Sequence, residues 1–96
     1  MADELITMNA CEAVQRLRDG EVTPLELIDA AEARIAQIEP QINALPTLCL
    51  DRARAHAEKL MAGDGCEAAG EAGWLAGLPV AIKDLVDVAG VRTTYG

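Results

Sequence analysis

The spacing of apolar residues near the start of the chain predicts an amphipathic helix. Apolar side chains recur at helical intervals between Ala10 and Leu17. Thr7 is available as an N-cap, and Gly20 can adopt the left-handed conformation that ends a helix. We therefore expect a short first helix between these two residues.

A second helix is predicted to begin at Thr23, where the start signals are fuller. Thr23 and Glu26 have the spacing of a capping box, and Pro24 lies at the first helical position. Val22 can pack against Leu27 across this start, as in a hydrophobic staple. These residues make this the best-defined helix start in the sequence.

One face of the second helix is expected to be buried and the other solvated. Pro40 disfavours helical backbone at Glu39, so we expect the helix to end there. Residues 41–48 are then expected to form an irregular or extended crossing, because Pro46 interrupts them. The apolar stripe of the helix consists of Ile28, Ala31, Ile35 and Ile38.

The rest of the chain is predicted to contain a third helix, a loop and a strand. The helix runs from about Asp51 to Met61, with Gly63 as its stop. Residues 79–83 form a short apolar run, which indicates a strand buried on both faces. The chain, residues 1–96, is thus expected to form helices over about 7–62, a loop over 63–73, and a strand with a loop over 74–96.

Composition and charge exclude several classes of protein. The 96 residues can form one small domain at most. The net charge of -8 opposes binding to nucleic acid and to anionic membranes. Cys11, Cys49 and Cys66 are widely separated, so they indicate neither a disulfide framework nor a zinc site. The N-terminus lacks the pattern of a signal peptide. We therefore expect a cytoplasmic protein with reduced thiols, no metal and no cofactor.

Lys83 is unusual because it ends the apolar run that predicts the strand. Burial of its ammonium is costly, and desolvation favours the neutral amine, which can act as a general base. The alternative is that Lys83 reaches solvent at the strand end and pairs with Asp84 or Asp87. The pattern of residues alone favours this alternative, since most lysines near strand ends are solvated.

The residues around Lys83 resemble the opening of the amidase signature family. That family has a Lys-Asp pair at the end of a Gly- and Pro-containing apolar segment, followed by a Gly and a Thr-Thr-x-Gly element. The resemblance covers essentially the whole chain. The matching segments are residues 75–84, 88–90 and 93–96, together with 23–27, 35–38 and 42–44 upstream.

The resemblance implies an amide hydrolase with a Ser, cis-Ser, Lys mechanism, in which Lys83 is the general base. It implies the α/β class: the N-terminal helices plus the first central strand of a mixed sheet covered by helices, as an incomplete domain. We interpret Asp84 as a turn or helix-start carboxylate that accepts backbone N–H bonds. His56 is interpreted as an ordinary surface or packing residue. The supporting loop would be formed by Gly90, Thr93, Thr94 and Gly96.

The chain contains no serine, so both serines of this mechanism are absent and the chain alone is expected to be inactive. The full-length form would take a small-molecule amide substrate. Its protein partner would be the absent C-terminal portion or a second copy of the chain. Two alternatives remain: the amidase subunit of a glutamyl-tRNA(Gln) amidotransferase, which acts on glutamine to supply ammonia, and a small helical module that binds a protein through its Ala/Ile face.

Overall fold

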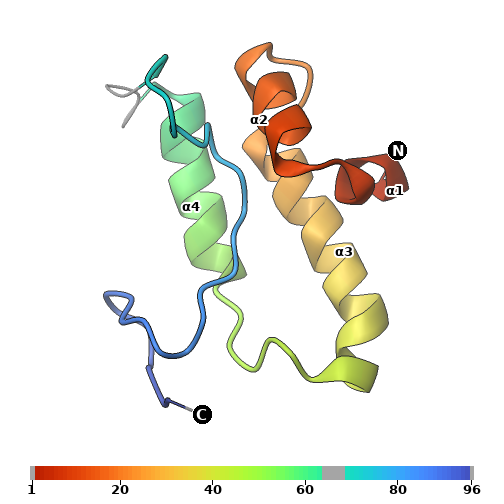
Figure 1. Ribbon diagram of the computed structural model, residues 1–96, viewed down its shortest axis with the longest axis vertical. Coiled ribbons are helices and arrows are strands. Elements are labelled where there is room, and N and C mark those ends of the chain that lie inside the picture. The colour runs from red at the N-terminus through yellow and green to blue at the C-terminus, as the bar shows by residue number, and fades with distance from the viewer. Residues whose placement is uncertain (1, 64–68, 96) are drawn as a thin grey trace.

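The computed structural model describes residues 2–63 and 69–95, and this part of the chain contains four helices (Figure 1). The longest helix, α3, packs antiparallel against α4, and α1 also packs against α3. A segment without regular structure then follows α4 and runs back along it toward the C-terminus. The helices are α1 (Ala2–Thr7), α2 (Ala10–Arg18), α3 (Pro24–Ile42) and α4 (Leu50–Met61).

The first predicted helix is confirmed as α2, but the predicted N-cap was wrong. Asn9, not Thr7, is the cap, and its side-chain oxygen accepts a hydrogen bond from the Glu12 N–H at 2.8 Å. Thr7 is instead the last residue of α1, a helix that the apolar pattern did not predict. Its hydroxyl donates to the Glu4 carbonyl within that helix at 3.2 Å.

The start of α3 is as predicted. The Thr23 hydroxyl accepts from the Glu26 N–H at 3.1 Å, and the Glu26 carboxylate accepts from the Thr23 N–H at 2.9 Å. Val22 and Leu27, the two residues of the predicted staple, are both buried. The capping box and these side chains fix the direction in which the chain enters α3.

The predicted end of α3 was wrong, because the helix continues through Pro40 to Ile42. Proline removes one helical N–H, but the hydrogen bonds after it stabilise the end of the helix. Asn43 adopts the left-handed conformation and donates its N–H to the Glu39 carbonyl at 2.8 Å. The Glu39 carboxylate accepts from the next two backbone N–H groups at 2.9 and 2.6 Å.

The third predicted helix is confirmed as α4. An arginine of α4, Arg54, connects it to α3. Arg54 forms ion pairs with Asp29 and Glu32, each at 3.1 Å. Hydrogen bonds to Glu32 and then to Asp29 raise the pKa of Arg54 above its ordinary value, although partial burial opposes the shift. A guanidinium is charged at all moderate pH values in any case, and this shift acts in the same direction.

The core between the helices is small and mostly made of short side chains. Of the predicted stripe on α3, Ile28 is buried, whereas its other three members are half-buried. No described helix has the length and hydropathy needed to cross a membrane. The buried apolar residues are Ala13, Val22, Leu27, Ile28, Ala30, Ala57 and Ala76.

Residues 79–83, the predicted strand, have no strand partner within the described residues. A strand is defined by ladder hydrogen bonds to a neighbour, so this segment cannot form one by itself. Val80 and Ile82 are 61% and 54% exposed, which leaves their apolar surface uncovered. The strand and the α/β class remain predictions. Part of the predicted loop, residues 64–68, lies outside the described residues.

Candidate functional site

Lys83 is exposed, and it immediately precedes a turn in which the Val86 N–H donates to the Lys83 carbonyl at 3.0 Å. The predicted pairing with Asp84 or Asp87 is not present, since the ion pairs of residues 2–63 and 69–95 are formed by Arg16 and Arg54. The described residues therefore do not desolvate the ammonium. Any burial of Lys83 has to come from atoms outside this part of the chain.

Asp84, the neighbour of Lys83, binds both the backbone and the side chain of Thr94. Its Oδ1 accepts from the Thr94 N–H at 2.9 Å, and its Oδ2 accepts from the Thr94 hydroxyl. The Asp84 carbonyl also accepts from the Tyr95 N–H at 3.1 Å. The interpretation of Asp84 as a turn carboxylate is therefore confirmed. These bonds close residues 84–95 into a loop whose two ends meet beside Lys83.

The tip of this loop is attached to α4 by Arg52. Val88 and Val91 form an isolated antiparallel bridge around the turn, and Gly90 has a φ of +78°, which favours glycine. The Arg52 guanidinium donates to the carbonyl of Ala89 in the same turn. The role of Arg52 was not predicted from the sequence, because no local pattern connects it to a carbonyl 37 positions away.

The Gly-Pro part of the segment before Lys83 is packed against the helices. Gly77 has a φ of +97°, and a Cβ built on it would lie 2.6 Å from Pro24 Cγ and 3.4 Å from Leu60 Cδ1. The preceding residue, Ala76, is buried and also has a positive φ of 57°. A glycine is favoured at position 77 because its φ is positive and because a side chain there would clash with Pro24 at the start of α3.

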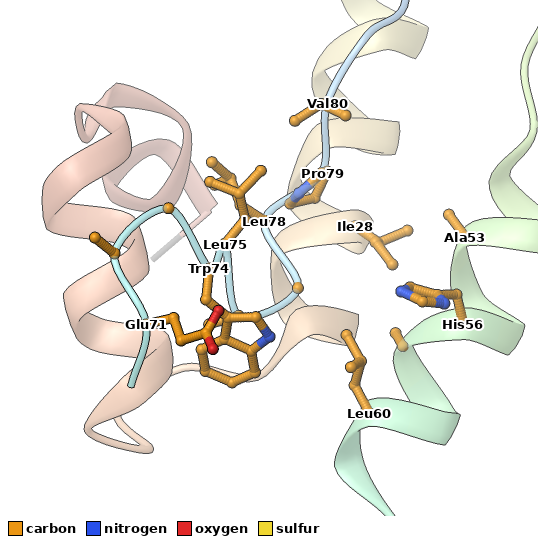
Figure 2. Close-up of a pocket in the computed structure, with 15 residues that line it drawn as sticks. Ile28, Ala53, His56, Leu60, Glu71, Trp74, Leu75, Leu78, Pro79 and Val80 are labelled. Carbon is orange, nitrogen blue, oxygen red and sulfur yellow. The ribbon is translucent and has the colours of Figure 1, made fainter. Parts of the chain in front are cut away.

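A hollow of about 650 Å³ lies between this segment and the two long helices. Figure 2 shows Ile28 of α3 with His56 and Leu60 of α4 on one side of the hollow, and Trp74 and Pro79 on the other. Lys83 does not line it. Its lining is mostly apolar, and His56 is an exposed side chain at its edge. The hollow and Lys83 are therefore separate features of the described residues.

Arg18 attaches the start of the same segment to α2. Its guanidinium lies 5.9 Å from the centre of the Trp74 ring and donates to the carbonyls of Glu71 and Trp74 at 3.2 and 3.3 Å. This arrangement combines a cation–π contact with two hydrogen bonds. It fixes the position at which the segment leaves the preceding loop.

The described residues contain no group of three or more His, Cys, Asp or Glu side chains that could hold a metal ion. Cys11 and Cys49 are exposed free thiols. Cys66, predicted to be a reduced thiol, and Gly96, predicted to belong to the supporting loop, lie outside the described part of the chain. The site therefore consists of Lys83 and the loop that Asp84 closes.

Comparison with known proteins gives one family. The model of the family described as Amidase matches residues 26–96. Three relatives, each named as a subunit of glutamyl-tRNA(Gln) amidotransferase, are similar to most of the chain. The Roseiflexus sp. (strain RS-1) protein is 45% identical over 91 residues, which are 95% of this chain and 18% of that protein. The Synechococcus sp. (strain CC9605) protein is 48% identical over 81 residues, 83% of this chain and 16% of that protein.

The Pelobacter propionicus (strain DSM 2379 / NBRC 103807 / OttBd1) protein is 41% identical over 93 residues, 97% of this chain and 19% of that protein. The chain thus spans about a fifth of the length of the curated relatives it matches. No solved structure matches the chain at a significant level.

Proposed function

Because the chain belongs to the amidase family, we propose that it is the N-terminal part of an enzyme that hydrolyses carbon–nitrogen bonds of amides by a Ser-cis-Ser-Lys mechanism. The observation that carries this proposal is the family match over residues 26–96, which includes Lys83 and the loop closed by Asp84. The two serines would come from a segment outside these 96 residues, since the chain has none.

In this mechanism the neutral amine of Lys83 takes a proton from the bridging serine, which takes one from the serine that attacks the amide carbonyl. A serine hydroxyl is a weak nucleophile until a base removes its proton, so Lys83 supplies the activation. The proton then returns to the leaving amine. Because Lys83 is exposed here and the serines are absent, we expect the 96-residue chain alone to be inactive.

The fold proposal follows from the apolar surface around Lys83. Val80, Ile82, Leu85 and Val86 are between 54% and 61% exposed, which is a large share for such side chains. We propose that residues 79–83 become a central strand of an α/β sheet when neighbouring strands pair with them. The same packing would exclude water from Lys83 and favour its neutral form.

The names of the relatives favour a second, narrower candidate: the amidase subunit of a glutamyl-tRNA(Gln) amidotransferase. In this candidate, glutamine is the amide that supplies ammonia, and the other subunits of the enzyme are the protein partners. A cytoplasmic location would agree with the exposed free thiols of Cys11 and Cys49.

The test is a fusion protein in which residues 1–96 replace the matching segment of the Roseiflexus relative, assembled with that relative's partner subunits. Ammonia release is measured from glutamine and from a simple aliphatic amide. We expect Lys83→Met to lower release by at least ~10³-fold, because the members of such a catalytic set act as a unit. Lys59→Met, at an exposed lysine of α4, is the matched control and should leave release unchanged.

One result of this experiment would distinguish the amidotransferase candidate from the general amidase, and another would refute the proposed mechanism. A strong preference for glutamine over the simple amide supports the amidotransferase candidate, and equal use of both supports a general amidase. Full ammonia release by the Lys83→Met fusion would show that Lys83 is not the base and would remove the proposed mechanism.

A further inference from the structure

The loop after Lys83 is closed by hydrogen bonds that join Asp84 to Thr94 and Tyr95. Asp84 accepts from the Thr94 N–H, from the Thr94 hydroxyl and, through its carbonyl, from the Tyr95 N–H. The N–H of Val86 also donates to the Lys83 carbonyl. The peptide groups on the C-terminal side of Lys83 are therefore held in place, although Lys83 itself is exposed.

We propose that Asp84 and Thr94 form a positioning pair for the catalytic lysine: Thr94 binds both carboxylate oxygens of Asp84 and so fixes the backbone of Lys83 against residues 94–95. The inference rests on the proposed function, in which Lys83 is the base. Asp84 and Thr94 act through Lys83 and are positioning residues.

The pair has a chemical consequence as well as a geometric one. A lysine has a long, flexible side chain, so its amine can be placed only through its backbone and its surroundings. A free carboxylate one residue away could pair with the ammonium and stabilise the charged form, which is the wrong form for a base. Thr94 binds both oxygens of Asp84 and thereby directs this carboxylate toward the loop and away from Lys83.

Arg52 holds the tip of the same loop. Its guanidinium donates to the Ala89 carbonyl, so the tip of the loop is attached to α4 while the base is closed by Asp84. A loop that is held at its base and at its tip presents residues 93–95 in one place. The sequence shows no such connection, because the partners are separated by 10 and by 37 positions.

The test uses two substitutions of Thr94 in the same fusion protein. Thr94→Val keeps the shape and the backbone N–H but removes the hydroxyl, whereas Thr94→Ser keeps the hydroxyl. We expect Thr94→Val to lower kcat for ammonia release by about 10–100-fold with little change in KM, since small misplacements of a catalytic group have effects of this size. Thr94→Ser should restore kcat to near the unsubstituted value.

The matched control is Thr47→Val, which makes the same chemical change at an exposed threonine between α3 and α4. Its kcat and KM should equal those of the unsubstituted fusion. Equal kcat values for Thr94→Val and Thr94→Ser would overturn the proposal. A loss that appeared in KM alone would also overturn it, because it would indicate a role in binding the substrate.

A second measurement tests the pair without relying on activity. Amide hydrogen exchange of Thr94, followed by NMR in the 96-residue chain, should be at least ~10-fold slower than in Asp84→Ala, because a hydrogen-bonded amide exchanges only when the bond opens. Equal exchange rates would show that the pair is absent and would overturn the proposal. This result is independent of the Lys83→Met experiment, so failure of the pair and failure of the proposed mechanism can be told apart.

Discussion

Gly77→Ala should destabilise the chain for two separable reasons. Alanine at a φ of +97° is strained, and its Cβ would lie 2.6 and 2.9 Å from two ring carbons of Pro24. The proline ring begins α3 and cannot rotate away, so the backbone on one side has to move. The segment that leads to Lys83 would then be pushed off the helices.

The size of the effect follows from these two causes. The left-handed conformation costs alanine roughly 1–2 kcal/mol. Forcing an extra methyl into a packed contact costs a further 1–3 kcal/mol or so. About 0.4–1 kcal/mol is offset, because alanine reduces the conformational entropy of the unfolded chain. We therefore expect a clear loss of unfolding free energy, large for a domain of this size.

Gly73→Ala is the matched control for the strain. Gly73 has a φ of +89°, and a Cβ there would meet nothing within 4 Å. It should show the conformational cost without the contact with Pro24. The difference between the two variants then measures the steric part alone.

The assay is urea unfolding, followed by circular dichroism for the helices and by the fluorescence of Trp74, the only tryptophan. Gly77→Ala should unfold at a lower urea concentration than Gly73→Ala. Pro24→Ala, added to Gly77→Ala, should recover part of the difference, because contacting residues are not additive. If the two glycine variants unfolded together, the close approach of Gly77 to α3 would be refuted.

Three further predictions concern the cap of α3 and the contacts of two arginines. Thr23→Ala should lower the unfolding free energy by about 1 kcal/mol, measured by urea unfolding, because the capping box of α3 is lost. Arg54→Ala should destabilise the chain at low salt and less so at 1 M salt, where the Debye length is roughly 3 Å and the two ion pairs of Arg54 are screened. The control, Arg34→Ala, should change the unfolding free energy little at either salt concentration. An Arg54 effect that did not change with salt would contradict an ionic origin. Arg18→Lys should shift the emission of Trp74, since the guanidinium above its ring is removed; an unchanged spectrum would show that this contact does not form in solution.

Local features of the helices could be predicted from the sequence, but their exact ends could not. The capping box at Thr23 involves residues three positions apart, so its chemistry is visible in the sequence. The predicted end of α3 was wrong because Pro40 does not end the helix, which continues to Ile42. Glu39 accepts two backbone N–H groups beyond the helix, and these bonds depend on a turn that the apolar pattern does not show.

The candidate site was only partly predictable for a similar reason. The resemblance pointed to Lys83, whose role as the base stays a prediction, and the turn role of Asp84 was correct. The contact of Arg52 with the loop and that of Gly77 with Pro24 join residues far apart in the chain. Such contacts depend on how the helices pack, which no local pattern specifies.

The uncovered apolar side chains near Lys83 have a consequence for synthesis on the ribosome. The helices upstream make mostly local contacts and can assemble as soon as they emerge. Val80, Ile82, Leu85 and Val86 then face water while later residues are added at about 5–20 per second. In a chain as long as the relatives, most residues are still to be made at that stage. We expect a nascent chain of this kind to bind chaperones through this segment until later residues cover it.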